Sequence, residues 1–150
     1  MRTTYKIEGL AQLDEALGDL RKATAKAVLR RVGKAALEPM ADAAERLAPV
    51  LTGQLRDSIT TGQKLAKRQA SLAKKDPPED FITVFMGPNN PAAVPQEFGT
   101  FDQKAQPFMR PAFEAEAEAT IMRVRDLMGP EIDKTVKRAA ARALKLAAKG

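Results

Sequence analysis

Apolar residues recur every three or four positions through most of the first 47 residues, and this repeat constrains the fold more than any other feature. The stripe begins at Leu10 and Leu13, continues through Val32, and stops before Pro49. Such spacing gives an α-helix one apolar face. The sequence therefore predicts a long first helix. We expect a kink or a restart at Pro39, because proline removes a backbone donor and clashes with the preceding turn.

Strand patterns in the chain are few and short. Alternation at residues 5–7 predicts a short first strand, and residues 55–61 predict a helical turn that leads into a second. The strongest strand pattern is "FITVFMG" at 81–87, which is β-branched and aromatic. Residues 62–80 have no strong periodic face and predict a long loop. The three prolines of "PNNPAAVP" at 88–95 predict irregular chain.

The C-terminal part of the sequence returns to helical spacing. Residues 110–128 predict a helix, which Gly129 and Pro130 should interrupt before a final basic helix. Long helices with few strands indicate an α+β fold. We expect a long N-terminal helix packed on a small, mostly antiparallel sheet, followed by a C-terminal helical segment. The predicted division is an α+β domain at 1–129 and a basic helix at 130–150.

The formal net charge is +6, and the excess of basic side chains lies in two segments. Residues 62–76, within a loop that we expect to be flexible, hold five basic groups and one acid, and residues 134–149 hold six basic groups and no acid. These side chains either form solvated surfaces or face a polyanion such as DNA. The candidates for contact with DNA or an acidic partner are Lys64, Lys67, Arg68, Lys74, Lys75, Lys134, Lys137, Arg138, Arg142 and Lys145.

The residue types in this chain argue against catalysis. Histidine and cysteine are both absent, which excludes thiolate and imidazole metal ligands and most hydrolytic triads. Glu114, Glu116 and Glu118 alternate at a spacing that does not converge on a helix, so they do not predict a metal site. No glycine-rich phosphate loop is present. We expect no enzyme activity, cofactor or metal, and no membrane partner, because no apolar run approaches the ~20 residues that cross a bilayer.

Large aromatic side chains gather in one irregular stretch, "QEFGTFDQKAQPFMRPAF" at residues 96–113. It contains four of the six phenylalanines of the chain, namely Phe98, Phe101, Phe108 and Phe113. Loops usually lie at the surface and carry few aromatics. These side chains therefore either pack back into the core or contact a partner.

Three features of this stretch predict local geometry. Gly99 should permit a tight turn that a residue with a Cβ could not make. Phe98 and Phe108 would anchor the loop in the core or under a neighbouring subunit. Arg110 should donate bidentate hydrogen bonds to a carboxylate such as Glu97.

Four motifs together resemble a known family. They are "IEGLAQLDEAL" at 7–17, "APVLTGQLRDSI" at 48–59, "QEFGT" at 96–100 and "QPFMRPAF" at 106–113. In this order they resemble the tail-component, or tail-completion, proteins of long-tailed bacteriophages. The family often has a helical turn just before its Glu-Phe-Gly-Thr motif, whereas the prolines at 91 and 95 predict extended chain here.

The resemblance implies a virion structural protein without catalytic activity. Such proteins form a ring, commonly a hexamer, at the head–tail junction, where they complete the tail and join it to the connector. The implied partners are further copies of the chain, a head–tail connector or stopper protein, and a tail terminator or tail-tube protein. Viral DNA passes through the lumen without sequence-specific contact. The implied location is the neck of the virion, and the host cytoplasm during assembly.

The resemblance also implies a subunit or partner interface, formed by Glu97, Phe98, Gly99, Thr100, Phe108 and Arg110. The alternative is that these residues stabilise only the single subunit. A second functional hypothesis is a basic nucleic-acid-binding module that acts through 62–76 and 134–149.

Overall fold

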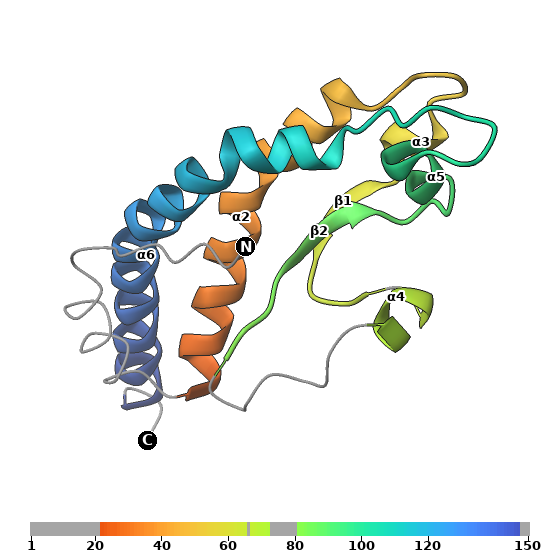
Figure 1. Cartoon of the computed structure of the whole chain (residues 1–150). Coiled ribbons are helices and arrows are strands. Elements are labelled where there is room, and N and C mark those ends of the chain that lie inside the picture. The colour runs from red at the N-terminus through yellow and green to blue at the C-terminus, as the bar shows by residue number, and fades with distance from the viewer. Residues whose placement is uncertain (1–21, 66, 73–80, 148–150) are drawn as a thin grey trace.

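The structure is a computed structural model that describes residues 22–65, 67–72 and 81–147 (Figure 1). Its elements are α2 (Lys22–Leu47), α3 (Gln54–Asp57), β1 (Ile59–Gly62), α4 (Lys67–Leu72), β2 (Phe85–Pro88), α5 (Ala93–Phe98) and α6 (Met109–Ala147). The predicted α+β class is confirmed. The predicted strand at 5–7 and the first part of the predicted helix lie outside the described residues.

Helices α2 and α6 pack against each other along much of their length (Figure 1). Val28 and Val32 of α2 are buried against Met128 and Ile132 of α6. Polar groups beside this cluster add a second connection between the helices. The Arg31 guanidinium donates from Nε to Glu131 at 3.0 Å and from a terminal nitrogen to the Thr135 hydroxyl at 3.3 Å.

Neither internal proline ends its helix. Helix α2 continues through Pro39 without a restart. It ends at Leu47, shortly before Pro49, where the sequence predicts its end. Helix α6 continues through Pro130, so the predicted interruption at this position is wrong. Figure 1 shows α6 bending partway along its length instead. The buried side chains of Met128 and Ile132 lie on either side of Pro130, and their packing on α2 offsets a proline cost of about 3 kcal/mol.

Strands β1 and β2 form a two-stranded antiparallel sheet, in which Ile59 pairs with Pro88 and Gly62 with Phe85. The strand predicted at 81–87 therefore begins four residues late, because β1 ends opposite Phe85 and leaves 81–84 without a partner strand among the described residues. Val84 lies against α2 instead. A Cβ added to Gly33 would come within 2.9 Å of its Cγ2 atom.

The prediction of extended chain before Glu97 is wrong, because helix α5 begins at Ala93. Pro95 is therefore the third residue of the helix. The first four N–H groups of a helix have no intrahelical acceptor, and a proline there removes no hydrogen bond. The chain therefore enters Glu97 as a helix.

The second part of the core lies where α2, the sheet, α5 and the start of α6 meet. Phe108 is its one large aromatic side chain and is fully buried. The other members are mostly alanines, which let these elements approach closely. They are Ala41, Ala43, Ala44, Ala48, Ile59, Ala93 and Ala112.

Candidate assembly interface

Glu97 connects α5 to the start of α6. The residue is 8% exposed, and its carboxylate accepts backbone hydrogen bonds from Phe108 at 2.8 Å, Met109 at 2.9 Å and Arg110 at 3.0 Å. These are N–H groups at the N-terminus of α6, which have no acceptor within the helix. A carboxylate at this position also opposes the positive end of the helix dipole. Glu97 is thus an N-terminal cap supplied by another helix.

This environment keeps Glu97 ionised. Burial raises the pKa of its carboxyl group, but the three backbone hydrogen bonds and the nearby Arg110 charge lower it. The lowering effects dominate, and the pKa falls below its ordinary value of 4.5.

Glu97 and Arg110 are in contact, as predicted, but through a different donor group of Arg110. Arg110 donates to Glu97 through its backbone N–H. Its side chain is exposed and lies over the ring of Phe98, with 5.9 Å between the guanidinium carbon and the ring centroid. The predicted bidentate guanidinium contact does not form, because the guanidinium lies over the Phe98 ring instead.

The chain between α5 and α6 is held by hydrogen bonds within itself. Gly99 has φ 77°, as the predicted turn requires, and its N–H donates to the Pro95 carbonyl at 2.8 Å. Thr100 donates from its N–H to the Gln103 carbonyl at 2.9 Å, and its hydroxyl accepts from the Gln103 N–H at 3.1 Å. Gln96 bonds Gln106 through both backbone and side chain, each at 2.8 Å. We name residues 98–105 the aromatic loop.

The turn at Gly99 gives the first prediction. A Cβ there would lie 2.8 Å from the Ala105 nitrogen and 2.9 Å from the Gln103 carbonyl oxygen. Together with the positive φ, this should make Gly99→Ala lower the free energy of unfolding by about 1–3 kcal/mol. Gly129→Ala is the matched control. Nothing lies within 4 Å of its added Cβ, so the mutation should stabilise α6 by about 1 kcal/mol.

Urea unfolding followed by circular dichroism measures both variants. Equal effects of the two mutations would show that the turn does not require glycine at residue 99.

The aromatic side chains of this region differ sharply in exposure. Phe108 is 0% exposed, whereas Phe98 is 69%, Phe113 58% and Phe101 103% exposed. Phe101 therefore makes no packing contact that covers its ring. Figure 1 shows the aromatic loop extending beyond the end of the long helices. A hydrogen-bonded loop thus presents apolar rings to solvent.

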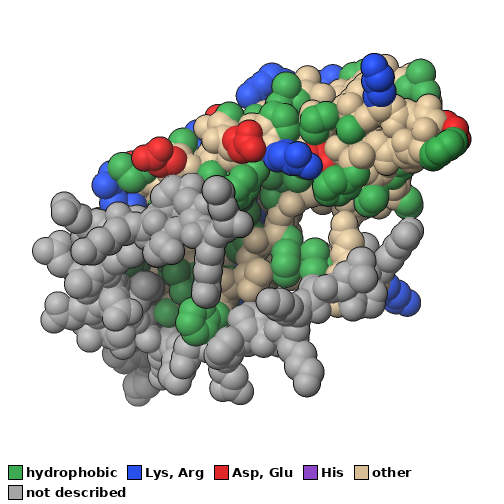
Figure 2. Space-filling model, viewed as in Figure 1, with side chains coloured by type: hydrophobic (Ala, Val, Ile, Leu, Met, Phe, Trp, Pro, Cys, Tyr) green, Lys and Arg blue, Asp and Glu red, His purple; other side chains and the backbone are tan. Residues whose placement is uncertain are grey.

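An open apolar groove lies between α2, residues 84–86 and α6, and we name it the apolar groove. Sequence reasoning did not identify it, because its walls come from three distant segments. It encloses about 420 Å³. Figure 2 shows hydrophobic side chains on the side of the long helices that faces the hairpin. Its lining includes Leu37, Met40, Val84, Phe113, Thr120 and Ile121.

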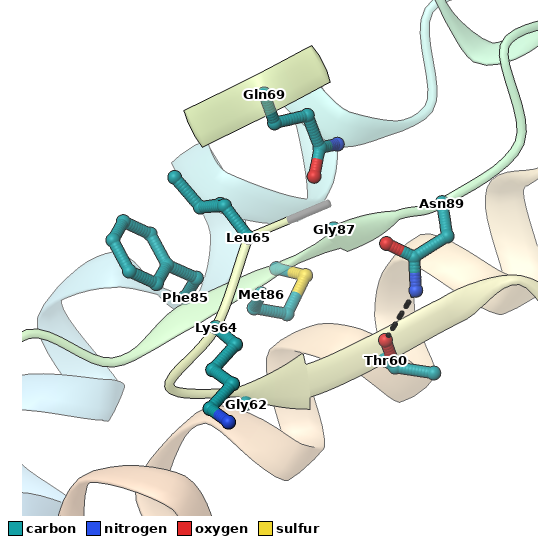
Figure 3. A pocket seen from close by; sticks show the side chains of 9 residues that line it. All are labelled: Thr60, Gly62, Lys64, Leu65, Gln69, Phe85, Met86, Gly87 and Asn89. Carbon is teal, nitrogen blue, oxygen red and sulfur yellow. Dashed lines mark hydrogen bonds between the residues drawn. The ribbon is translucent and has the colours of Figure 1, made fainter. Parts of the chain in front are cut away.

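A smaller pocket of about 100 Å³ lies at the hairpin (Figure 3). Asn89 donates to the Thr60 hydroxyl across it at 3.1 Å. Gln69 of α4 donates from its side-chain amide to the Pro88 carbonyl at 3.2 Å. This contact connects α4 to the sheet. The segment predicted to be a long basic loop therefore contains a short helix.

The predicted basic contact residues do not form one patch around the aromatic loop. Lys64 and Lys67 are exposed beside the hairpin, and Lys134 pairs with Glu131 at 3.2 Å. Lys137, Arg138 and Arg142 are exposed on the last part of α6. Lys74 and Lys75 lie outside the described residues, as do the side chains of Arg68 and Lys145.

The described part of the chain holds no group of three or more acidic, histidine or cysteine side chains that could bind a metal ion. None of the helices described is long and apolar enough to cross a membrane.

Comparison with known protein families gives a match within the first two thirds of the chain. Residues 11–99, more than half of the chain, match the HK97-gp10-like family model, described as Bacteriophage HK97-gp10, a proposed tail component. No curated protein and no solved structure gives a significant match. The matched region ends at Gly99, inside the aromatic loop.

Proposed function

The chain belongs to the HK97-gp10-like family of bacteriophage tail components, and we propose from this premise that it forms a ring at the head–tail junction. In this role it completes the tail, joins it to the connector and performs no catalysis. Its partners are further copies of itself, a head–tail connector or stopper protein, and a tail terminator or tail-tube protein. The ring belongs to the neck of the virion and assembles in the host cytoplasm.

The observation that carries this proposal is the exposed aromatic loop. Its backbone is fixed by the Gly99 turn and by hydrogen bonds, yet Phe98 and Phe101 remain exposed. Interfaces are enriched in aromatic residues and arginine at their centres, and the pair of Phe98 and Arg110 has this composition. A loop ordered before binding also loses less entropy when a partner covers it.

The basic part of α6 supports contact with DNA in the lumen of the ring. Lys137, Arg138 and Arg142 are exposed and form no ion pair with the described residues. Such side chains attract phosphates without reading sequence. This fits a passage through which DNA of any sequence must move.

The second prediction tests the interface role of Arg110 and Phe98. Arg110→Ala and Phe98→Ser should leave unjoined heads and tails when each variant replaces the wild-type protein in infected cells. Because both side chains are exposed, we expect monomer stability to change by less than about 1 kcal/mol. Electron microscopy of lysates and thermal unfolding measure the two effects. Arg125→Ala is a control, since Arg125 pairs with Asp126 on α6, away from the aromatic loop.

Normal joining of heads to tails by both variants would contradict the proposal. Normal joining together with duplex binding by the isolated protein that weakens steeply with salt would instead favour the nucleic-acid-binding module.

A further inference from the structure

We propose that the aromatic loop of one copy docks into the apolar groove of a second copy, in a head-to-tail contact. This inference rests on the proposed function, since it names the contact that would connect neighbouring subunits of the ring. It commits to a second copy of the chain as the occupant of the groove.

The groove leaves apolar surface exposed to solvent in a single subunit. Phe113 lines it and remains 58% exposed. Exposed apolar surface in a groove is in contact with water, and a docked apolar side chain would remove it from water.

The aromatic loop presents an exposed apolar ring, and the lining of the groove is mostly apolar. Phe101 is fully exposed, which shows that it does not fill the groove of its own subunit. A phenylalanine ring buries on the order of 150–250 Å² when it is covered, and a groove of about 420 Å³ can accept it. Most of the loop backbone is already fixed, so docking need not order it first.

Charges near the two surfaces are complementary. On α6 the exposed Glu114 and Glu118 directly follow the groove residues Phe113 and Ala117, and neither forms an ion pair with the described residues. The loop carries Asp102 and Lys104, so its net charge is zero, and both side chains are exposed. Lys104 is the cation of the loop that can pair with an acidic side chain of the groove rim, a contact that favours correct docking.

The geometry determines the type of assembly. The aromatic loop extends from one end of the molecule (Figure 1), whereas the groove lies between α2, residues 84–86 and α6. Because two different surfaces meet, each copy keeps one free loop and one free groove. Such a heterologous contact generates a closed ring or an open filament.

The third prediction uses the absence of cysteine in the chain. Asp102→Cys, which keeps the Phe101 ring, and Ile121→Cys are prepared as separate full-length proteins, mixed, and treated with a short bis-maleimide. We expect cross-linked dimers in the mixture on the order of tenfold above either variant alone, because only the mixture places the two cysteines in one heterologous contact. Lys104→Glu in the loop partner should lower the yield on the order of threefold, and Glu114→Lys in the groove partner should restore it.

Three results would overturn the inference. Dominant dimers of Asp102→Cys alone would indicate an isologous contact, and absence of dimers would exclude the contact. Cross-linking within one chain that carries both Leu13→Cys and Ile121→Cys, in place of dimers, would assign the groove to the N-terminal segment. Cross-linked dimers from a protein that is absent from the virion neck would support this contact while contradicting the proposed function.

Discussion

Replacing Phe108 with alanine should lower the free energy of unfolding by about 3–5 kcal/mol. The ring is fully buried where α2, the sheet, α5 and α6 meet. Most of its neighbours in that cluster are alanines, such as Ala44 and Ala112, which have no side chain long enough to fill the space. The cavity should therefore remain open, and its cost adds to the lost burial of the ring.

Phe101→Ala is the matched control for this prediction. It removes the same atoms from a fully exposed ring, so monomer stability should change by less than about 0.5 kcal/mol. Urea unfolding compares the two variants, provided that the free energy of unfolding falls with urea concentration at the same slope in both. Equal losses would show that Phe101 is buried in solution, and no loss from Phe108→Ala would show that the second core is not formed as described.

The sequence predicted elements whose causes are local. The apolar repeat ends at Leu47 because Pro49 follows, and α2 ends there. The turn at Gly99 was predictable because glycine alone adopts its φ without strain. Both follow from a few neighbouring residues.

The misplaced elements depend on contacts between distant segments. Pro130 favours the end of a helix, but the packing of Met128 and Ile132 on α2 keeps the helix continuous. The strand at 81–87 is shortened because its partner β1 ends at Gly62. Local patterns indicate what a segment favours, and the packing of other segments decides whether that preference holds.

The candidate site shows the same division. The opposite charges of Glu97 and Arg110 predicted a contact between their side chains. The observed donor is the backbone N–H of Arg110, which every residue except proline has and which a sequence pattern therefore does not indicate. The exposure of Phe101 and the burial of Phe108 could not be distinguished from residue type. The apolar groove was missed because three segments form its walls.

Glu97→Ala gives the second large effect that we expect, a loss of about 2–4 kcal/mol in the free energy of unfolding. The mutation leaves three N–H groups at the start of α6 without their acceptor. Hydrogen bonds to charged groups contribute about 1.5–3 kcal/mol each, and they are not additive when they share one carboxylate. Thermal unfolding should show a midpoint lower by about 4–16 °C for a chain of this size. Glu118→Ala, which removes an exposed carboxylate, is the control and should change stability little.

The dependence on pH identifies the charge of Glu97 as the cause. Its pKa in the folded protein is below the ordinary value of 4.5, so the folded state favours the ionised form. The resulting stability is fully present above pH 4.5 and is lost as the pH falls through the folded pKa. Glu97→Gln keeps the size of the side chain but cannot ionise, so the stability difference from wild type should shrink across this range. A difference that stays constant from pH 7 to about pH 3 would show that the cap acts through packing and not through its charge.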